Sequence, residues 1–316
     1  MNYLINIKYS MNNTFNEIIE NIAQNVSLSN NKNIKIVCDS GGFNGGYMLG
    51  CLLYLKNLEN KQIIIVDKIS GSSIGSLMAL AYALDKLESI YPYIIKMTQS
   101  YKKNKNLYDW SKILQEYIDN NVQHSDLINL TEKLYINYYS FTSNSEIVIN
   151  EYKTLHDLYL TIMYSTHLPF IIDGHIAHDN NIDNMSPFVF EERTLDDPKI
   201  IFIKLTTYSR LKKIFHIKGE INFNERITEG ILDIHKFFKY KQNTSLCSCV
   251  NNWGLYDYVE FRTRNILIYC LFLILFILKK SSDLIPNILI NSKIYSIFSN
   301  YSKKIYGDLF TLFYNS

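Results

Sequence analysis

The sequence predicts an α/β protein, because two short apolar strands alternate with two helical segments early in the chain. The run Ile34-Lys35-Ile36-Val37 is β-branched and stops at Ser40-Gly41-Gly42, which indicates a buried strand entering a tight turn. Apolar residues then recur at helical spacing from Gly45 to Leu58. A second apolar run, Gln62–Ile69, is followed by a helical pattern from Ile74 to about Leu87. This order is typical of a parallel βαβ unit with a right-handed crossover.

Two further elements are predicted downstream of this unit. Thr154 to Ser165 has the pattern of a helix, and Thr154 and Asp157 have the spacing of a capping-box pair. Lys199 to Leu205 is apolar and β-branched, which indicates another buried strand. Three regions are therefore expected: an Asn-rich N-terminal segment at 1–33 with an amphipathic helix around Phe15 to Val26, a folded domain at 34–240, and a C-terminal region at 241–316.

Composition and charge exclude some classes of protein. Lys and Arg number 32 against 30 Asp and Glu, which leaves a net charge of +2 over 316 residues. A nucleic-acid-binding protein normally carries a basic excess, so no nucleic-acid partner is expected. The five cysteines are odd in number and irregularly spaced, and no apolar signal segment follows the N-terminus. We therefore expect an intracellular protein with reduced thiols.

The most hydrophobic stretch of the chain lies in the C-terminal region. Ile266 to Leu278 is apolar throughout and is bounded by Arg264-Asn265 and by Lys279-Lys280. A membrane-spanning helix needs about 20 apolar residues, and shorter runs are more often buried or interfacial. Three interpretations stay open: a buried helix, an interfacial helix or short membrane anchor, and a true span.

The turn after the second predicted strand has the pattern of a nucleophile elbow. Gly71-Ser72-Ser73-Ile74-Gly75 is a G-x-S-x-G pentapeptide between an apolar strand and an apolar helix. A nucleophile at such a sharp turn has strained backbone dihedrals, so the residues two positions away must be small. The middle serine, Ser73, is the candidate nucleophile, and Ser72 is expected to point elsewhere.

The turn after the first strand is a glycine-rich loop, from Ser40 to Gly46. Its exposed N–H groups and the following helix N-terminus suit phosphate or the oxyanion of an acyl-transfer intermediate. A nucleotide site is disfavoured, because the loop lacks a G-K-[ST] sequence and a suitable acidic residue does not follow. A purely structural turn is the remaining alternative.

Four segments, in order along the chain, resemble motifs of the patatin-like phospholipases. SGGFNGGYMLGCLLYL resembles the G-G-G-x-[RK]-G loop and the helix after it, and ISGSSIGSLMAL resembles the G-T-S-x-G-A elbow. Residues 164–170 (YSTHLPF) are similar to the family's A-S-x-x-I-P-x-F segment. Asp179 to Pro187 are similar to its D-G-[GA] motif and the N-x-P after it. The resemblance covers roughly residues 34–207.

The resemblance implies a three-layer α/β/α sheet with flanking helices, followed here by a helical C-terminal region. It implies a Ser–Asp dyad in which Ser73 attacks an ester carbonyl and Asp179 takes its proton. It places the oxyanion hole at Gly41, Gly42 and Phe43, and it requires neither a cofactor nor a metal ion. The implied substrate is a phospholipid or another acyl lipid, hydrolysed or transferred through an acyl-serine. Contact with a membrane surface is therefore expected, peripherally or through a short C-terminal anchor.

Other acidic and basic side chains compete for the role of the base. Asp173-Gly174 is interpreted as the turn of a hairpin that precedes the motif. His167, His175 and His178 lie nearby in the sequence and leave a Ser-His-Asp arrangement open.

Four residues of this chain depart from the family's motifs. In the loop, Ser40 replaces a glycine and Asn44 replaces the basic residue; after the motif aspartate, Asn180 and Asn181 replace small residues. Asn tolerates left-handed backbone, so the turn is expected to survive. The departures motivate a second hypothesis, a catalytically silent, membrane-associated protein that retains the fold.

Overall fold

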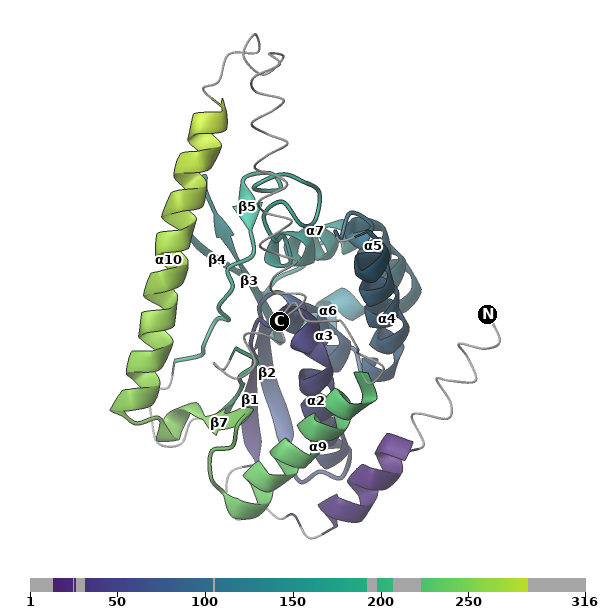
Figure 1. Cartoon of the computed structure of the whole chain (residues 1–316). Helices are drawn as coiled ribbons and strands as arrows, with labels where there is room; N and C mark the ends of the chain where they lie inside the picture. The colour runs from purple at the N-terminus through teal and green to yellow at the C-terminus, as the bar shows by residue number, and fades with distance from the viewer. Residues whose placement is uncertain are drawn as a thin grey trace.

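The computed structural model describes residues 14–24, 26, 32–104, 106–191, 198–206 and 223–283. Parts of the predicted N-terminal segment and of the C-terminal region, including 1–13 and 284–316, lie outside the described residues. The described chain forms helices on both sides of a mixed β-sheet (Figure 1). This is the three-layer α/β/α architecture that the sequence predicts.

The sheet has seven strands in the described part of the chain, in the order β4-β3-β2-β1-β6-β7, with β5 also paired to β3. The strands are β1 (Asn33–Cys38), β2 (Ile65–Gly71), β3 (Leu134–Ser140), β4 (Ser145–Ile149), β5 (Asn181–Ile182), β6 (Lys199–Ile203) and β7 (Cys247–Cys249). The four central strands, β3, β2, β1 and β6, run parallel, and β4, β5 and β7 pair antiparallel at the margins. Cys38 pairs with Gly71, so β1 and β2 end side by side and their turns meet at one edge of the sheet.

Most helices cover one face of the sheet (Figure 1). They are α2 (Gly45–Asn60), α3 (Ile74–Ala83), α4 (Leu87–Asn104), α5 (Trp110–Asn121), α6 (Asp126–Leu130), α7 (Leu155–Ser165) and α9 (Phe223–Tyr240), with a short 3-10 turn, η1 (Gly42–Asn44), before α2. The main hydrophobic core lies between these helices and the sheet, and it includes Ile34, Ile36 and Cys38 of β1. Thr154 and Asp157 make the predicted capping box at the start of α7, with both hydrogen bonds at 3.0 Å.

Two close helix contacts depend on glycine. A Cβ at Gly50 of α2 would lie 2.0 Å from the carbonyl oxygen of Ile227, and one at Gly230 of α9 would lie 2.1 Å from the carbonyl oxygen of Tyr47. No side chain fits at such distances, so the two glycines let the backbones of α2 and α9 touch. This packing brings the N-terminal half of α9 under the glycine-rich loop.

The other face of the sheet is covered by one long helix, α10 (Leu255–Asp283), which follows the 3-10 turn η3 (Val250–Asn252). Phe261 of α10 contacts Phe202 of β6 with ring centroids 6.0 Å apart, and Phe272 contacts Tyr139 of β3 at 4.3 Å. The hydrophobic stretch Ile266–Leu278 lies within this helix. Among the described residues, no helix is long and apolar enough to cross a lipid bilayer.

Candidate active site

Ser73 occupies a strained turn between β2 and α3. Its φ is 56° and its ψ is −130°, a positive-φ conformation that is unusual for a residue with a side chain. The tight turn depends on its glycine neighbours, because a Cβ at Gly75 would lie 2.5 Å from the Cys38 carbonyl oxygen and one at Gly71 would lie 2.3 Å from the Gly75 oxygen. The pentapeptide therefore adopts the geometry expected of a nucleophile elbow.

The end of α7 holds this turn in place. The Ser73 amide donates to the carbonyl oxygen and to the hydroxyl oxygen of Ser165, both at 3.1 Å. On the other side, the Ser76 hydroxyl donates to the Ser73 carbonyl oxygen at 2.6 Å. Only 6% of Ser73 is exposed.

The carboxylate beside Ser73 belongs to Asp183, which follows β5 directly and is 1% exposed. Asp183 accepts a hydrogen bond from the Ser72 hydroxyl at 3.3 Å, and the neighbouring Ser73 side chain lowers the pKa of the Asp183 carboxyl. The Met185 amide donates to the same carboxylate at 2.8 Å. Ser72, expected to point elsewhere, thus contacts the carboxylate that lies next to Ser73.

The environment of Asp183 raises the pKa of its carboxyl group. Burial, which disfavours the charged carboxylate, raises the pKa of Asp183 to about 7. Hydrogen bonds from Ser73 and its neighbours oppose this rise, and so does the positive charge of Arg264. A carboxylate with a pKa near neutrality has the proton affinity that a general base requires at neutral pH.

Asp179, the base that the motif resemblance selects, lies elsewhere. Its side chain is 67% exposed and accepts a hydrogen bond from the Tyr164 hydroxyl at 3.0 Å. Asp179 and Asn180 both have positive φ, 48° and 65°, and Asp179 does not line the cavity that contains Ser73 and Asp183. Asn180 thus adopts the left-handed conformation expected of it, but the geometry favours Asp183 over Asp179 as the partner of Ser73.

The three nearby histidines do not complete a Ser-His-Asp arrangement. Both ring nitrogens of His167 lack a hydrogen-bond partner, although the side chain is fully buried. Burial lowers the pKa of His167, so its ring is neutral. His178 faces Asp173 and Asp179, and His175 is exposed. Asp173-Gly174 forms the expected turn, with Gly174 at φ 82° and the His175 amide bonded to Asp173.

The glycine-rich loop lies beside the serine. Ser40, Gly41 and Gly42 line a cavity together with Ser73 and Asp183. Phe43 lines a second, small apolar cavity of about 40 Å³ that also borders Ser73. Gly41, Gly42 and Phe43 thus line cavities that border Ser73.

Arg226 of α9 supplies the positive charge that the loop itself lacks. Its guanidinium donates to the Phe43 carbonyl oxygen at 2.7 Å and to the Asn44 side-chain oxygen at 2.9 Å. Arg226 is 7% exposed and its guanidinium also lies over the Tyr47 ring at 5.4 Å. Asn44, which replaces the basic residue, therefore binds a basic residue from another helix.

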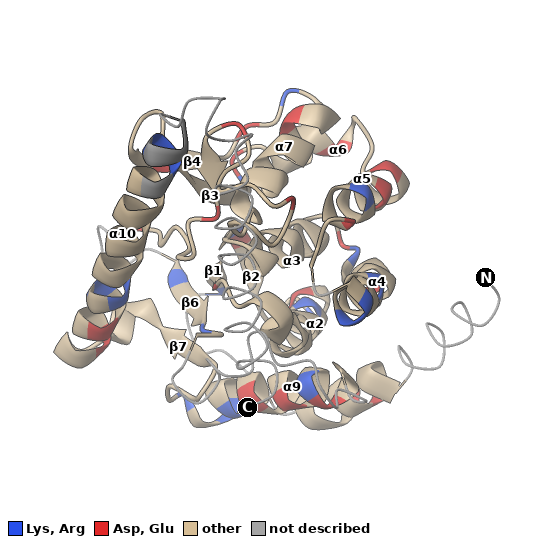
Figure 2. Ribbon diagram, turned by 45° about the horizontal axis from the view of Figure 1, so that its top comes forward, with Lys and Arg blue, Asp and Glu red and all other residues tan. Residues whose placement is uncertain are grey.

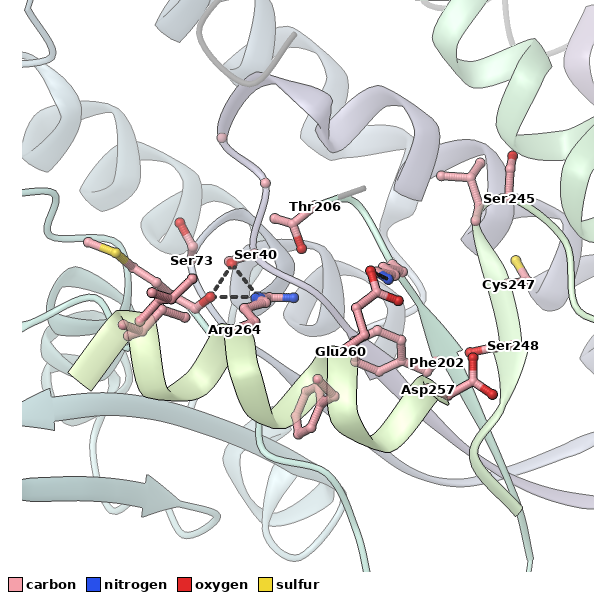
Figure 3. A pocket seen from close by; sticks show the side chains of 18 of the residues that line it. Ser40, Ser73, Phe202, Thr206, Ser245, Cys247, Ser248, Asp257, Glu260 and Arg264 are labelled. Atoms are coloured by element: carbon pink, nitrogen blue, oxygen red, sulfur yellow. Dashed lines mark hydrogen bonds and ion pairs between the residues drawn. The ribbon is translucent and has the colours of Figure 1, made fainter. Parts of the chain in front are cut away.

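A second arginine fastens α10 to the same edge of the sheet. Arg264 forms a bidentate ion pair with Asp39, which is fully buried at the end of β1, with distances of 2.6 and 3.1 Å. Arg264 also donates to the Ser40 hydroxyl and to the Met185 carbonyl oxygen. Figure 3 shows Arg264 extending from α10 toward Ser40, with Ser73 nearby.

The cavity at this edge has a volume of about 840 Å³. Its far wall consists of apolar side chains from β6, from the segment before α10 and from α10 itself, including Phe202, Trp253, Phe261, Leu267 and Leu271. Charged and polar side chains also line the cavity away from Ser73, among them Lys204, Asp257 and Glu260. A cavity of this size, with apolar walls and several polar groups, can hold a ligand that has both an apolar and a polar part.

The sequence model of the patatin-like phospholipases matches residues 36–201, just over half of the chain. The chain belongs to this family. No curated protein sequence matches the chain significantly. Membership in the patatin-like phospholipases implies a lipid acyl hydrolase in general.

Sequence reasoning on this patatin-like chain missed three side chains of the site. Asp183 lies within the matched residues, but the motif resemblance selects the aspartate four positions earlier. Arg226 and Arg264 lie beyond the match, and no local pattern marks either of them. One signal was available for Asp183, since an acidic residue directly after an apolar strand residue, Ile182, is often placed at a sheet edge by that strand.

Proposed function

We propose that this protein hydrolyses fatty acyl esters of phospholipids or related lipids through an acyl-serine intermediate at Ser73, with Asp183 as the general base. The observation that carries the proposal is that Ser73 lies beside the buried Asp183, whose pKa is raised to about 7 by burial and lowered in turn by the Ser73 side chain. Acyl transfer through a serine requires a nucleophile with a base beside it.

The reaction takes two steps. Ser73 Oγ attacks the ester carbonyl carbon while its proton passes to Asp183, and the carbonyl oxygen becomes an oxyanion facing the amides of Gly41 and Gly42. The intermediate then expels the alcohol, which takes the proton from Asp183, and leaves the acyl group on Ser73. Water attacks this ester in the second step, again with Asp183 as the base, and releases the fatty acid.

The buried charge of Arg226 supports the oxyanion site. Its hydrogen bond to the Phe43 carbonyl oxygen polarises the peptide bond between Phe43 and Asn44. Together with the bond to the Asn44 side chain, it holds the loop against α9. This arrangement argues against a silent protein, because the chain retains a positive charge at the loop despite Asn44.

The cavity wall indicates the kind of acyl group that fits. Leu267 and Leu271 of α10 line the cavity and are also 66% and 39% exposed. An apolar path therefore leads from the outer surface of α10 into the cavity toward Ser73. A lipid tail is the substrate part that such a path accommodates.

The same helix presents a surface that suits contact with a lipid membrane. Ile266, Leu273, Ile274 and Ile277 are each more than half exposed. Figure 2 shows α10 with charged residues toward its ends and an uncharged stretch between them. An exposed apolar face next to basic residues such as Lys280 is typical of helices that lie in the membrane interface. We propose that α10 docks on the membrane and delivers lipid to the cavity.

A fluorogenic lipid ester tests the hydrolase. We expect Ser73→Ala to lower turnover by at least about a thousandfold, because it removes the nucleophile. Ser72→Ala loses one hydrogen bond to Asp183 and should lower turnover only modestly. Equal activity of the Ser73→Ala variant and the unmodified protein would refute the assignment. Absence of turnover and of fluorophosphonate labelling at Ser73, in folded protein with lipid present, would favour the catalytically silent alternative.

Liposome sedimentation tests the docking helix. Ile274→Glu places a charge on the exposed face of α10 and should reduce binding to anionic vesicles, while hydrolysis of a short-chain soluble ester is kept. Ile128→Glu is the matched control, because Ile128 is 80% exposed on α6, far from α10 in sequence and on the other face of the sheet. If both variants bind vesicles like the unmodified protein, α10 is not the docking element.

A further inference from the structure

Three potential metal ligands converge outside the Ser73 site, in the segment between α7 and β5. They are His167, Asp173 and His178, and their ligand atoms lie within 4.8 Å of one another. His167 Nε2 lies 3.9 Å from one carboxylate oxygen of Asp173, and His178 Nδ1 lies 3.5 Å from the other. The carboxylate thus stands between the two imidazole rings.

His167 carries an independent sign that a ligand belongs here. Its side chain is fully buried, yet neither ring nitrogen has a hydrogen-bond partner. Leaving a buried polar group unpaired costs about 1–3 kcal/mol, so native proteins rarely do so without a reason. A nitrogen lone pair aimed at a neighbouring carboxylate and a second imidazole is satisfied by a metal ion between them.

The residue types and spacing fit zinc. Two imidazoles and one carboxylate are ligands that Zn²⁺ commonly takes. A tetrahedral zinc ion with bonds of about 2.1 Å separates its ligand atoms by about 3.4 Å. The distances of 3.9 and 3.5 Å, each to a different oxygen of Asp173, come close to this value, and one ligand atom from each residue lies within 4.8 Å of the others. The His175 amide donates to Asp173 at 2.8 Å, which orients the carboxylate as an outer-shell hydrogen bond does in zinc sites.

We propose that His167, Asp173 and His178 form a zinc site that fastens the loop between α7 and β5. This differs from the sequence-based expectation that the chain holds no metal. A water molecule completes the tetrahedron, since three protein ligands leave one position open.

The position of the site gives the ion a supporting role for the serine chemistry. The His167 carbonyl oxygen accepts a hydrogen bond from the Asp183 amide at 3.1 Å. Two residues earlier, Ser165 binds the Ser73 amide. An ion that fixes His167 therefore also fixes the backbone on which the nucleophile and its carboxylate are held. The zinc ion holds this backbone in position and does not contact the reacting atoms.

The test is zinc binding by the full chain, in a Cys270→Ser background because Cys270 is the exposed thiol among the five cysteines. After treatment with a chelator, the protein is titrated with Zn²⁺, and metal content and melting temperature are measured. We expect one zinc ion per chain and a higher melting temperature with zinc. Cobalt substitution should give the visible bands of a tetrahedral ion without a thiolate charge-transfer band.

Variants locate the site. His178→Ala and Asp173→Asn change partly exposed residues and should weaken zinc binding by at least about tenfold and remove the melting-temperature rise. His156→Ala, on the first turn of α7, is the matched control and should bind zinc like the unmodified protein. Failure of the unmodified protein to bind zinc, or equal binding by all of these variants, would overturn the proposal. Fluorophosphonate labelling of Ser73 is measured in parallel, so loss of the zinc site and loss of the proposed hydrolase are distinguished.

Discussion

The raised pKa of Asp183 makes opposite predictions for activity and for stability. Activity requires the ionised carboxylate, so kcat/KM should fall about tenfold per pH unit as the pH drops below about 7. Stability changes in the other direction. The folded protein holds the Asp183 proton up to about pH 7, whereas the unfolded chain releases it near the ordinary value of 3.8. Below pH 3.8 Asp183 is protonated in both states and its burial costs the folded protein no ionisation energy. As the pH rises from 3.8 toward 7, the unfolded chain gains stability by releasing this proton, so the free energy of unfolding falls.

Asp183→Asn removes this pH dependence and shows its size. From the two pKa values, ionisation of Asp183 costs the folded state about 1.5 kcal/mol at about pH 5 and about 4 kcal/mol at about pH 8. Relative to the unmodified protein, the variant should therefore gain about 2.5 kcal/mol in unfolding free energy between these pH values. For a chain of 316 residues that gain corresponds to roughly 4 °C in melting temperature.

Denaturant unfolding of both proteins at several pH values measures this difference. Effects of the other carboxylates are common to both proteins and cancel in the comparison. The reasoning is refuted if the stability difference between the variant and the unmodified protein is independent of pH, or if it shifts against the variant as the pH rises. An activity profile without an inflection near pH 7 would independently remove Asp183 from the role of base.

Three further substitutions test the rest of the site. Arg226→Met should lower turnover about tenfold or more, and it should lower the free energy of unfolding by about 1–3 kcal/mol because two buried oxygens lose their donor. Arg226→Lys should have intermediate turnover and stability. A fully active Arg226→Met variant would exclude a role for this charge. Arg264→Gln leaves Asp39 buried without its cation and should cost about 3 kcal/mol in unfolding free energy. The exposed Arg262→Gln should cost less than about 0.5 kcal/mol, and equal losses would count against the Arg264–Asp39 pair. Gly75→Ala puts a Cβ 2.5 Å from a backbone oxygen and should destabilise by about 3 kcal/mol or more, which circular dichroism melts would show.

Local pattern was sufficient for much of the fold. The strand before the glycine-rich loop, the elbow at Ser73 and the capping box at Thr154 each follow from residues within a few positions of one another. Gly71 and Gly75 are required by contacts across the elbow, and their spacing shows in the sequence. Features of this kind are predictable because short-range sterics determine them.

Features that depend on long-range packing were not predictable in the same way. Asp179 lies in a left-handed turn and bonds to Tyr164, while Asp183 lies beside Ser73, and this difference in position does not show in the local sequence. Arg226 reaches the loop because α9 packs closely on α2, and nothing near it in the sequence shows this contact. The apolar run at 266–278 was visible, but α10 begins at Leu255. Its role in lining the cavity appears only in three dimensions.

Fluorophosphonate labelling of Ser73 in two aspartate variants tests the central claim most directly, because the probe reacts only with an activated serine. If Asp183 activates Ser73, the Asp183→Asn variant should lose labelling while folded, and the Asp179→Asn variant should label at nearly the rate of the unmodified protein. The reverse result, with labelling kept in Asp183→Asn and lost in Asp179→Asn, would contradict the account.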